Sequence, residues 1–243
     1  MKTIRRYLLL LAGVVSLVGL CVMMVSCDDD DVTPGGGGSS DTHEYVDLGL
    51  PSGTLWATCN IGANSPEEYG DYFAWGETTV QDSYEWGTYQ WCEGSYNTLT
   101  KYCNDDAFGY NGFTDDPALT ELVAGDDAAT ANWGVKWRMP TIGQFEELIN
   151  SEYTETAWTT ENGVNGCRIT SKSNGKSIFL PAAGYRQGGS LYCAGSDGYY
   201  WSRTLGTNTP DYARALYLDS GCIYTNDYYD RNYGRSVRPV RAQ

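Results

Sequence analysis

The chain has 243 residues, of which 41% are hydrophobic and 14% aromatic, and its 31 acidic and 16 basic residues give a formal net charge of −15. A chain of this charge repels phosphate backbones and sulfated glycans, which argues against a nucleic-acid partner. The only histidine is His43, so the residues that follow it cannot form a His-containing catalytic triad or a His-rich zinc site.

The first 26 residues (1–26) predict a lipoprotein signal peptide. Three basic residues near the N-terminus precede an uncharged, mostly apolar stretch over 7–26, and the small Ser26 stands directly before Cys27. This is the order of a secretory signal followed by the cysteine that the lipoprotein signal peptidase recognises. A membrane-spanning helix is the alternative, because about 20 apolar residues can cross a bilayer. After cleavage, acyl chains on Cys27 would anchor the protein, since each buried methylene contributes roughly 0.8 kcal/mol.

Residues 27–43 predict a flexible acidic linker that begins at the acylated cysteine. Four aspartates, Asp28 to Asp31, are followed by Thr, Pro, Gly and Ser residues, a composition typical of flexible coil. The acidic run resembles the surface-export signal of Bacteroidetes lipoproteins, and this resemblance implies the outer face of the outer membrane. A lipoprotein that faces the periplasm, with the run as a solvated spacer, is the alternative.

Removal of the leader makes the mature chain more acidic. The leader holds three of the 16 basic residues and none of the 31 acidic ones, so the formal charge of the remainder is −18. Neutral glycans, cations and basic protein surfaces are therefore the partners that this charge permits.

Residues 44–243 predict one domain, because about 200 residues are enough to bury a core. An exported location permits disulfides between its six cysteines. Cys92 and Cys103 are the nearest pair in the sequence and the first candidates for a bridge, while free buried thiols are an equal alternative. The six residues are Cys59, Cys92, Cys103, Cys167, Cys193 and Cys222.

The first third of the domain predicts short strands followed by loops. Residues 44–48 and 54–61 are β-rich runs separated by a Pro-Ser-Gly turn signal. Residues 72–75 predict a further short strand. Residues 79–125 are rich in Gly, Asn, Asp and aromatic residues with weak periodicity, and we expect loops there.

Two helices are predicted next. The segment 126–133 begins with two acids, which the helix dipole favours at that end. A second helix is predicted from Thr141, because Thr141 and Gln144 have capping-box spacing and Phe145 and Leu148 lie on one apolar face.

The rest of the chain predicts strands separated by glycine-rich turns. Together with the helices they predict an α+β fold, a single compact domain of two helices, short antiparallel strands and long loops. The predicted strands are 167–171, 177–181, 199–203, 213–218 and 236–241.

Several segments in combination resemble the Fibrobacter succinogenes major paralogous domain family, which is common in surface lipoproteins. The resemblance spans nearly all of 44–241. That family is similar to C-type-lectin-like and formylglycine-generating-enzyme-like domains, so the resemblance implies a C-type-lectin-like domain with paired N- and C-terminal strands and ligand contacts on a long loop region. The segments that carry it are YVDLGLPSGTLWATCNIGANSPEEYGDYFAWGET (45–78), DDAATANWGVKWRMPTIGQFEEL (126–148), NGKSIFLPAAGYR (174–186), GYYWSRT (198–204) and GRSVRPVR (234–241).

Three acidic pairs are candidates for a Ca²⁺ site, because Ca²⁺ takes six to eight oxygen ligands. They are Asp105–Asp106, Asp115–Asp116 and Asp126–Asp127. No loop has EF-hand spacing, and the Glu-Pro-Asn and Gln-Pro-Asp tripeptides of calcium-dependent lectins do not occur. We therefore expect a solvated acidic face and no cofactor, with Ca²⁺ as the alternative.

Two kinds of enzyme are alternatives to a binding protein. A glycosidase needs a pair of carboxylates, and nothing in the sequence singles one pair out among 31 acids. A formylglycine-generating-type oxidase would need two copper-binding cysteines, for which Cys193 and Cys222 are the candidates. Only the fragment Gly188–Ser190 of the surrounding motif is present, so we expect no catalytic activity.

The segment 198–235 predicts the ligand-binding site, because it holds eight of the 20 tyrosines. Tyr and Trp offer large, rigid contact area, and Arg and Asn add hydrogen bonds. The run from Tyr224 to Tyr233 has no two-residue period, so we expect an exposed loop there; half-buried strand tyrosines are the alternative. The predicted ligand contacts are Trp201, Arg203, Arg214, Tyr224, Asn226, Tyr228, Tyr229, Asn232 and Arg235.

These patterns together predict a surface-anchored recognition module, an adhesin-like lipoprotein that binds a glycan or a protein without transforming it. A polysaccharide-acting enzyme and a fimbrial or surface-assembly component are the alternatives. The sequence offers no obvious polymerising strand for the last of these.

Overall fold

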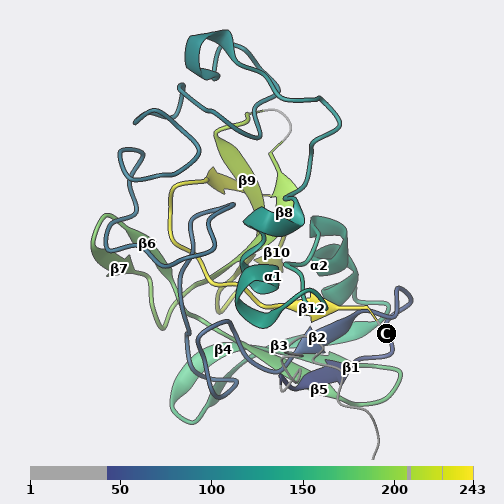
Figure 1. The fold of residues 1–243 in the computed structure, drawn as a ribbon. Helices are drawn as coiled ribbons and strands as arrows, with labels where there is room; N and C mark the ends of the chain where they lie inside the picture. The colour runs from purple at the N-terminus through teal and green to yellow at the C-terminus, as the bar shows by residue number, and fades with distance from the viewer. Residues whose placement is uncertain (1–42, 207–208, 226, 243) are drawn as a thin grey trace, which may run out of the picture. The chain divides into compact units, whose positions relative to one another are not determined.

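The computed structural model describes residues 43–206, 209–225 and 227–242 (Figure 1). The described residues form two short α-helices and twelve short strands, arranged in small antiparallel sheets. The predicted α+β class is confirmed at this level. No helix in the described part of the chain is long and apolar enough to cross a membrane. The signal peptide, Cys27 and the linker up to residue 42 lie outside the described residues.

The first sheet joins the two ends of the domain. Its order is β1 (Tyr45–Asp47), β2 (Leu55–Ala57) and β12 (Val240–Arg241), with Trp56 opposite Val240. The expected pairing of N- and C-terminal strands is therefore present. The predicted strand 236–241 is shorter than expected, because the residues before Val240 form only isolated bridges, such as the one between Ser236 and Tyr200. The predicted strand 72–75 is likewise reduced to one bridge at Phe73.

The second helix begins where the sequence predicted, whereas the first begins two residues later than expected, at Ala128 in place of Asp126. In α1 (Ala128–Trp133) the carboxylate of Asp127 accepts the backbone N–H of Thr130 at 2.9 Å. In α2 (Ile142–Leu148) both hydrogen bonds of the capping box between Thr141 and Gln144 are formed. These caps satisfy backbone donors that a helix start leaves unpaired.

A long hairpin opens the second sheet. β3 (Thr154–Glu161) pairs along its whole length with β4 (Val164–Ser171), which pairs in turn with β5 (Ser177–Pro181). The connecting residues Asn162 and Gly163 both have positive φ, 48° and 85°, as a two-residue type I′ turn requires. β3 was not predicted from the sequence.

The central sheet is built on β9 (Tyr212–Leu218). β8 (Gly198–Leu205) pairs with one side of β9, and both β10 (Ile223–Tyr224) and β11 (Tyr228–Asp230) pair with the other. A separate hairpin of β6 (Tyr185–Gln187) and β7 (Ser190–Tyr192) precedes it.

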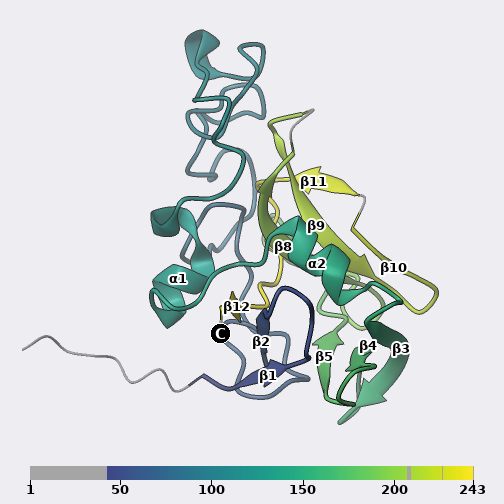
Figure 2. The same cartoon turned by 90° about the vertical axis from the view of Figure 1, so that its right-hand side faces the viewer.

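Both faces of the central sheet are buried, because successive side chains of a strand point to opposite faces. On one face Trp201, Ala213 and Ala215 join a core that includes Ala128 and Ala129 of α1. On the other face Tyr200, Leu216 and Leu218 join a second core with Phe145 and Leu148 of α2. The helices therefore pack on opposite faces, and Figure 2 shows α2 against β8 and β9.

The predicted loop region 79–125 contains only one complete 3₁₀ turn, Tyr110–Gly112, and the start of a second, Ala124–Asp126. It is held to the rest of the domain by the buried Arg231. This side chain donates to the carbonyls of Lys101, Tyr102 and Pro210 and to the hydroxyl of Tyr89.

All six cysteines of the described residues are free, so the predicted Cys92–Cys103 bridge is wrong. The two thiols make separate local contacts. Cys92 Sγ donates to the carbonyl of Trp86 and Cys103 Sγ to the carbonyl of Asp105, each at 3.1 Å. The equal alternative of free thiols is the one observed.

Candidate functional site

Seven tyrosine rings form one connected group, here called the tyrosine cluster. Six ring contacts join them, with centroid distances between 5.0 and 5.8 Å. Tyr185 and Tyr199 are its centre, because each contacts at least three other members. The members are Tyr185, Tyr192, Tyr199, Tyr217, Tyr224, Tyr229 and Tyr233.

Strand register brings these rings together. Tyr199 of β8 lies opposite Tyr217 of β9, and Tyr217 lies opposite Tyr224 of β10. Cross-strand neighbours of this kind have Cβ atoms about 5 Å apart, so their rings touch. The β6–β7 hairpin adds Tyr185 and Tyr192, which are paired across its two strands.

Three aspartates border the tyrosine cluster and accept hydrogen bonds from its hydroxyl groups. Tyr217 donates to Asp219 at 2.8 Å. Tyr224 and Tyr229 both donate to Asp227, at 3.0 and 3.1 Å. A longer contact of 3.4 Å joins the Tyr199 hydroxyl to Asp197. The site therefore combines aromatic surface with a carboxylate rim.

Arg235 is buried, with 2% of the residue exposed. Its guanidinium lies within the tyrosine cluster. Its central carbon is 4.0 Å from the ring centroid of Tyr229 and 4.7 Å from that of Tyr199. Neither Nε nor Nη1 has a hydrogen-bond partner in the described residues. The aromatic faces around it therefore supply cation–π attraction in place of those hydrogen bonds.

Burial sets the protonation states of the tyrosine cluster. It lowers the pKa of Arg235 to about 10, so this side chain keeps its charge at neutral pH. Burial, followed by the hydrogen bond to Asp227, raises the pKa of Tyr224 to about 12. Burial also raises the pKa of Tyr199 and of Tyr217. The hydroxyl groups of Tyr199, Tyr217 and Tyr224 are therefore neutral hydrogen-bond donors at physiological pH.

The structure separates the residues that the sequence grouped as ligand contacts. Tyr224 and Tyr229 belong to the tyrosine cluster. Arg214 and Tyr228 pair across β9 and β11, where the guanidinium lies 5.6 Å from the Tyr228 ring centroid. This pair is near α2, because Arg214 also contacts Glu146 at 3.3 Å.

Several other predicted contacts are internal, and the expectation of an exposed loop from Tyr224 to Tyr233 is wrong. Trp201 is fully buried and donates from Nε1 to the carbonyl of Phe73. Asn232 is also buried, with its amide directed to the carbonyl of Tyr84. This segment is fixed by the pairing of β11 with β9 and by the burial of the Arg231 and Arg235 side chains in the interior. Only Asn226 of this run lies outside the described residues.

Arg203 is also placed apart from the tyrosine cluster, in an ion pair of 3.0 Å with Glu121. Conversely, sequence reasoning missed Tyr185 and Tyr192. A usable signal was present, because these residues stand symmetrically on either side of Gly188–Gly189. A Gly-Gly dipeptide between two short runs is a hairpin signal, and the register it sets places the two tyrosines opposite each other.

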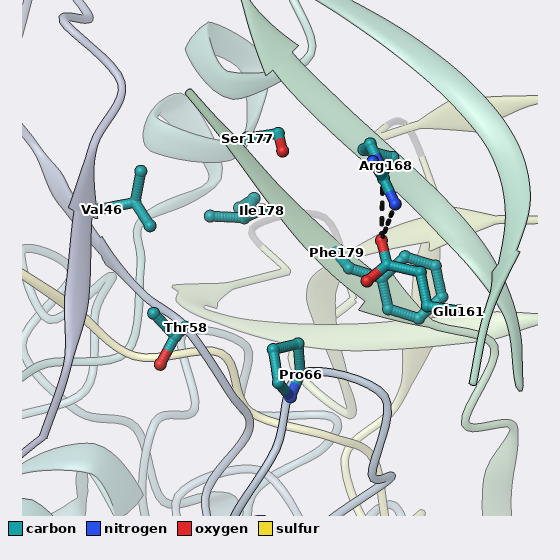
Figure 3. Close-up of a pocket in the computed structure, with 8 residues that line it drawn as sticks. All are labelled: Val46, Thr58, Pro66, Glu161, Arg168, Ser177, Ile178 and Phe179. Atoms are coloured by element: carbon teal, nitrogen blue, oxygen red, sulfur yellow. Dashed lines mark hydrogen bonds and ion pairs between the residues drawn. The ribbon is translucent and has the colours of Figure 1, made fainter. Parts of the chain in front are cut away.

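Two surface hollows lie away from the tyrosine cluster. The hollow in Figure 3, of about 170 Å³, is lined by Val46, Phe179 and an ion pair in which Arg168 donates to Glu161 at 2.8 and 3.1 Å. Its volume is below the range of about 300–1,000 Å³ that small-molecule sites occupy. A second hollow, of about 330 Å³, is lined by polar groups that include Asp71, Asp82 and Arg186.

The acidic pairs serve local structure. Asp127 caps α1 and accepts the N–H of Met139, and Asp126 accepts from Lys101. Asp115 accepts the backbone N–H of Tyr102. Among the described residues, no three His, Cys, Asp or Glu side chains are grouped so that they could hold a metal ion.

The thiols are poorly suited to nucleophilic chemistry. Burial is the largest cause that raises the pKa of all six described cysteines, to about 11 for Cys167. Since the thiolate is the reactive form, the raised pKa lowers the reactive fraction of these side chains at neutral pH.

Residues 158–240 match the model of a family described as Domain of unknown function (DUF8237). The matched stretch is less than half of the chain, and it contains every member of the tyrosine cluster. No curated protein and no solved structure matches the chain.

Proposed function

We propose that the protein is a surface-tethered recognition module that holds a neutral glycan or a protein ligand on the tyrosine cluster without transforming it. The observation that carries this proposal is the seven connected rings with Arg235 among them and carboxylates at the border. Aromatic faces stack on the apolar faces of sugars or on protein side chains, and the neutral hydroxyl groups and carboxylates supply oriented hydrogen bonds.

The charge of the chain narrows the ligand class. With a formal charge of −18 after loss of the leader and three aspartates beside the rings, an anionic ligand would meet repulsion. Uncharged sugars and basic or neutral protein surfaces avoid this cost.

We also propose the finer fold and the location that the sequence implies. Paired terminal strands, two helices and a long loop region support a C-type-lectin-like domain of the Fibrobacter succinogenes major paralogous family. The leader and Cys27 support a lipid anchor in the outer membrane with the domain facing outward. Mass spectrometry of residue 27 tests the anchor, because acyl chains add a mass that an unmodified cysteine lacks.

Binding of the full chain to an array of neutral glycans tests the function. We expect retention of at least one glycan class, and a loss of affinity of about tenfold or more in Tyr192→Ala and in Tyr224→Ala, since tenfold corresponds to about 1.4 kcal/mol. Tyr110→Ala is the matched control, because Tyr110 is as exposed as Tyr192, 45% in both, but lies in the loop region outside the tyrosine cluster.

The same experiment distinguishes the alternatives. If Tyr110→Ala and Tyr192→Ala reduce retention equally, the site assignment is wrong. If no glycan is retained, a parallel screen against surface proteins tests whether the ligand of the tyrosine cluster is a protein. Released sugar after overnight incubation with a retained polysaccharide would contradict the non-enzymatic proposal and support a hydrolase.

A further inference from the structure

β3 is the edge strand of its sheet. Among the described residues, the order β3–β4–β5 leaves one side of β3 without a neighbouring strand, and Figure 2 shows β3 at the outer side of this sheet. Glu155, Thr156 and Ala157 are exposed. An edge strand of eight residues is long enough to template a further strand.

The backbone groups that face outward can be assigned from the turn. A two-residue type I′ turn makes Glu161 and Val164 a hydrogen-bonded pair, and such pairs alternate along the hairpin. The N–H and C=O groups of Thr156, Trp158 and Thr160 therefore point away from β4. No backbone hydrogen bond from elsewhere in the described residues reaches these three positions.

The usual protection of an edge strand is missing here. Natural edges are blocked by proline, by lysine, by bulges or by very short strands. β3 has none of these: its sequence is TETAWTTE, and its register with β4 is unbroken over eight pairs. Its two charges are at Glu155 and Glu161, and the second is already paired with Arg168.

A groove of about 360 Å³ lies beside this edge. Thr156 and Trp158 of β3 form one wall, and residues 219–223 of the β9–β10 turn form the other. Asp219 is the only charged residue among those that line it. Hydrogen bonds from the backbone, first from the N–H of Gly221, lower the pKa of Asp219, so the carboxylate stays ionised at neutral pH.

We propose that β3 accepts an extended segment of a basic partner protein as an additional strand, with one lysine or arginine side chain seated in the groove beside Asp219. Backbone hydrogen bonds to the outward groups of β3 supply affinity, and the groove supplies specificity for the side chain, as in other cases of strand addition. Charge selects the occupant: a second copy of this chain would bring a further formal charge of −18, whereas a basic segment is attracted.

This docking edge adjoins the tyrosine cluster at Asp219, which also accepts a hydrogen bond from the hydroxyl group of Tyr217, but the proposal does not depend on the glycan ligand. It gives the chain a means of joining an assembly through main-chain pairing while the tyrosine cluster holds its own ligand.

Peptide binding to the full chain tests the proposal. The probe is a capped nonapeptide that alternates threonine and valine around a central lysine. Two comparison peptides carry a central glutamate or N-methyl groups on alternate amides, which remove the donors needed for strand pairing. We expect the lysine peptide to bind about tenfold or more tightly than either comparison and to slow hydrogen exchange across residues 154–161. Equal binding of the three peptides, or unchanged exchange in this segment, would overturn the proposal.

Two variants of one residue locate the contact. Thr156→Pro removes an outward N–H but leaves the β3–β4 ladder intact, since proline is tolerated where the N–H faces solvent; Thr156→Ala keeps that N–H. We expect at least about tenfold weaker peptide binding for the first and about threefold or less for the second. Equal binding by the two variants contradicts strand addition. The N-methylated peptide gives the same information on the unchanged protein if the proline variant does not fold.

Two further outcomes are informative. Tyr192→Ala, which should lose glycan retention, is expected to keep peptide binding, so that failure of one proposal can be told from failure of the other. If the exchange of residues 154–161 slows with protein concentration alone and a dimer forms, β3 pairs with a second copy, and the assignment to a basic partner is wrong.

Discussion

Three buried arginines near the C-terminus show how environment decides the role of one residue type. Arg231 and Arg238 donate hydrogen bonds to backbone carbonyls, whereas Arg235 is surrounded by aromatic faces. None of the three has a carboxylate within ion-pair distance in the described residues. Their charge is therefore balanced by dipoles and ring electrons, and the neighbouring chain segments are fixed by the geometry of the guanidinium.

The buried Arg238 is expected to contribute strongly to the free energy of unfolding. Its guanidinium joins the carbonyls of Ala57, Thr58 and Phe179, so Arg238→Ala leaves several buried acceptors unpaired. We expect a loss of about 3 kcal/mol or more in the free energy of unfolding, measured by urea denaturation. Arg238→Lys should recover little of it, because an ammonium group cannot reproduce the planar fork.

Arg168→Ala is the matched control, because the Arg168–Glu161 pair is partly exposed, with 47% of the Arg168 side chain accessible. Exposed ion pairs contribute about 1 kcal/mol or less. If the Arg238 and Arg168 variants lose similar stability, the interior hydrogen bonds of Arg238 do not stabilise the fold as described.

The buried carboxyl group of Glu77 is expected to make the free energy of unfolding depend on pH. Burial raises its pKa, against the opposing hydrogen bonds from Gln90 and Gln81. The folded state therefore holds this proton more tightly than the unfolded state, and the contribution of Glu77 to stability falls as pH rises through the window above about 4. Glu77→Gln removes the titration, so the stability of the variant relative to the parent should rise between pH 4 and pH 7. Denaturation curves at the two values measure it; a constant difference would contradict the raised pKa.

At the scale of elements, local sequence signals were sufficient to predict some of the helices and strands. The capping box of α2 is formed by residues three positions apart, and β5 coincides with the predicted run 177–181 because its apolar residues are buried on both faces. β3 was missed because its sequence TETAWTTE has polar residues on both faces. Its conformation comes from pairing with β4 through the Asn162–Gly163 turn.

The candidate site was predicted only in part for a related reason. Tyr224 and Tyr229, both predicted as ligand contacts, belong to the tyrosine cluster, but two of its seven members, Tyr185 and Tyr192, come from the β6–β7 hairpin, outside the tyrosine-rich segment 198–235. Arg235 and Asn232 were both predicted as ligand contacts, and Asn232 lay in the run expected to be an exposed loop. Five aromatic rings around Arg235, three of them distant in the sequence, and the carbonyl of Tyr84 beside Asn232 allow the burial of these side chains, and a sequence does not reveal such distant partners.

At the scale of the whole molecule, two surfaces are proposed to act on one acidic domain. The tyrosine cluster is proposed to hold a ligand, and the β3 edge is proposed to hold a basic strand. The net negative charge, −15 for the full sequence, acts on both, because it disfavours self-association and anionic ligands at low ionic strength. Binding of the lysine peptide should therefore weaken with added salt more than retention of a neutral glycan.

Hydroxyl-radical footprinting of the full chain, with and without a retained glycan, tests the central claim most directly, because oxidation of each tyrosine reports the accessibility of its ring. Tyr192 and Tyr224 should be protected by the glycan, while Tyr110 should be oxidised to the same extent in both samples, and the glycan should be recovered unchanged. Protection of Tyr110 without protection of the tyrosine cluster, or recovery of cleaved glycan, would contradict the account.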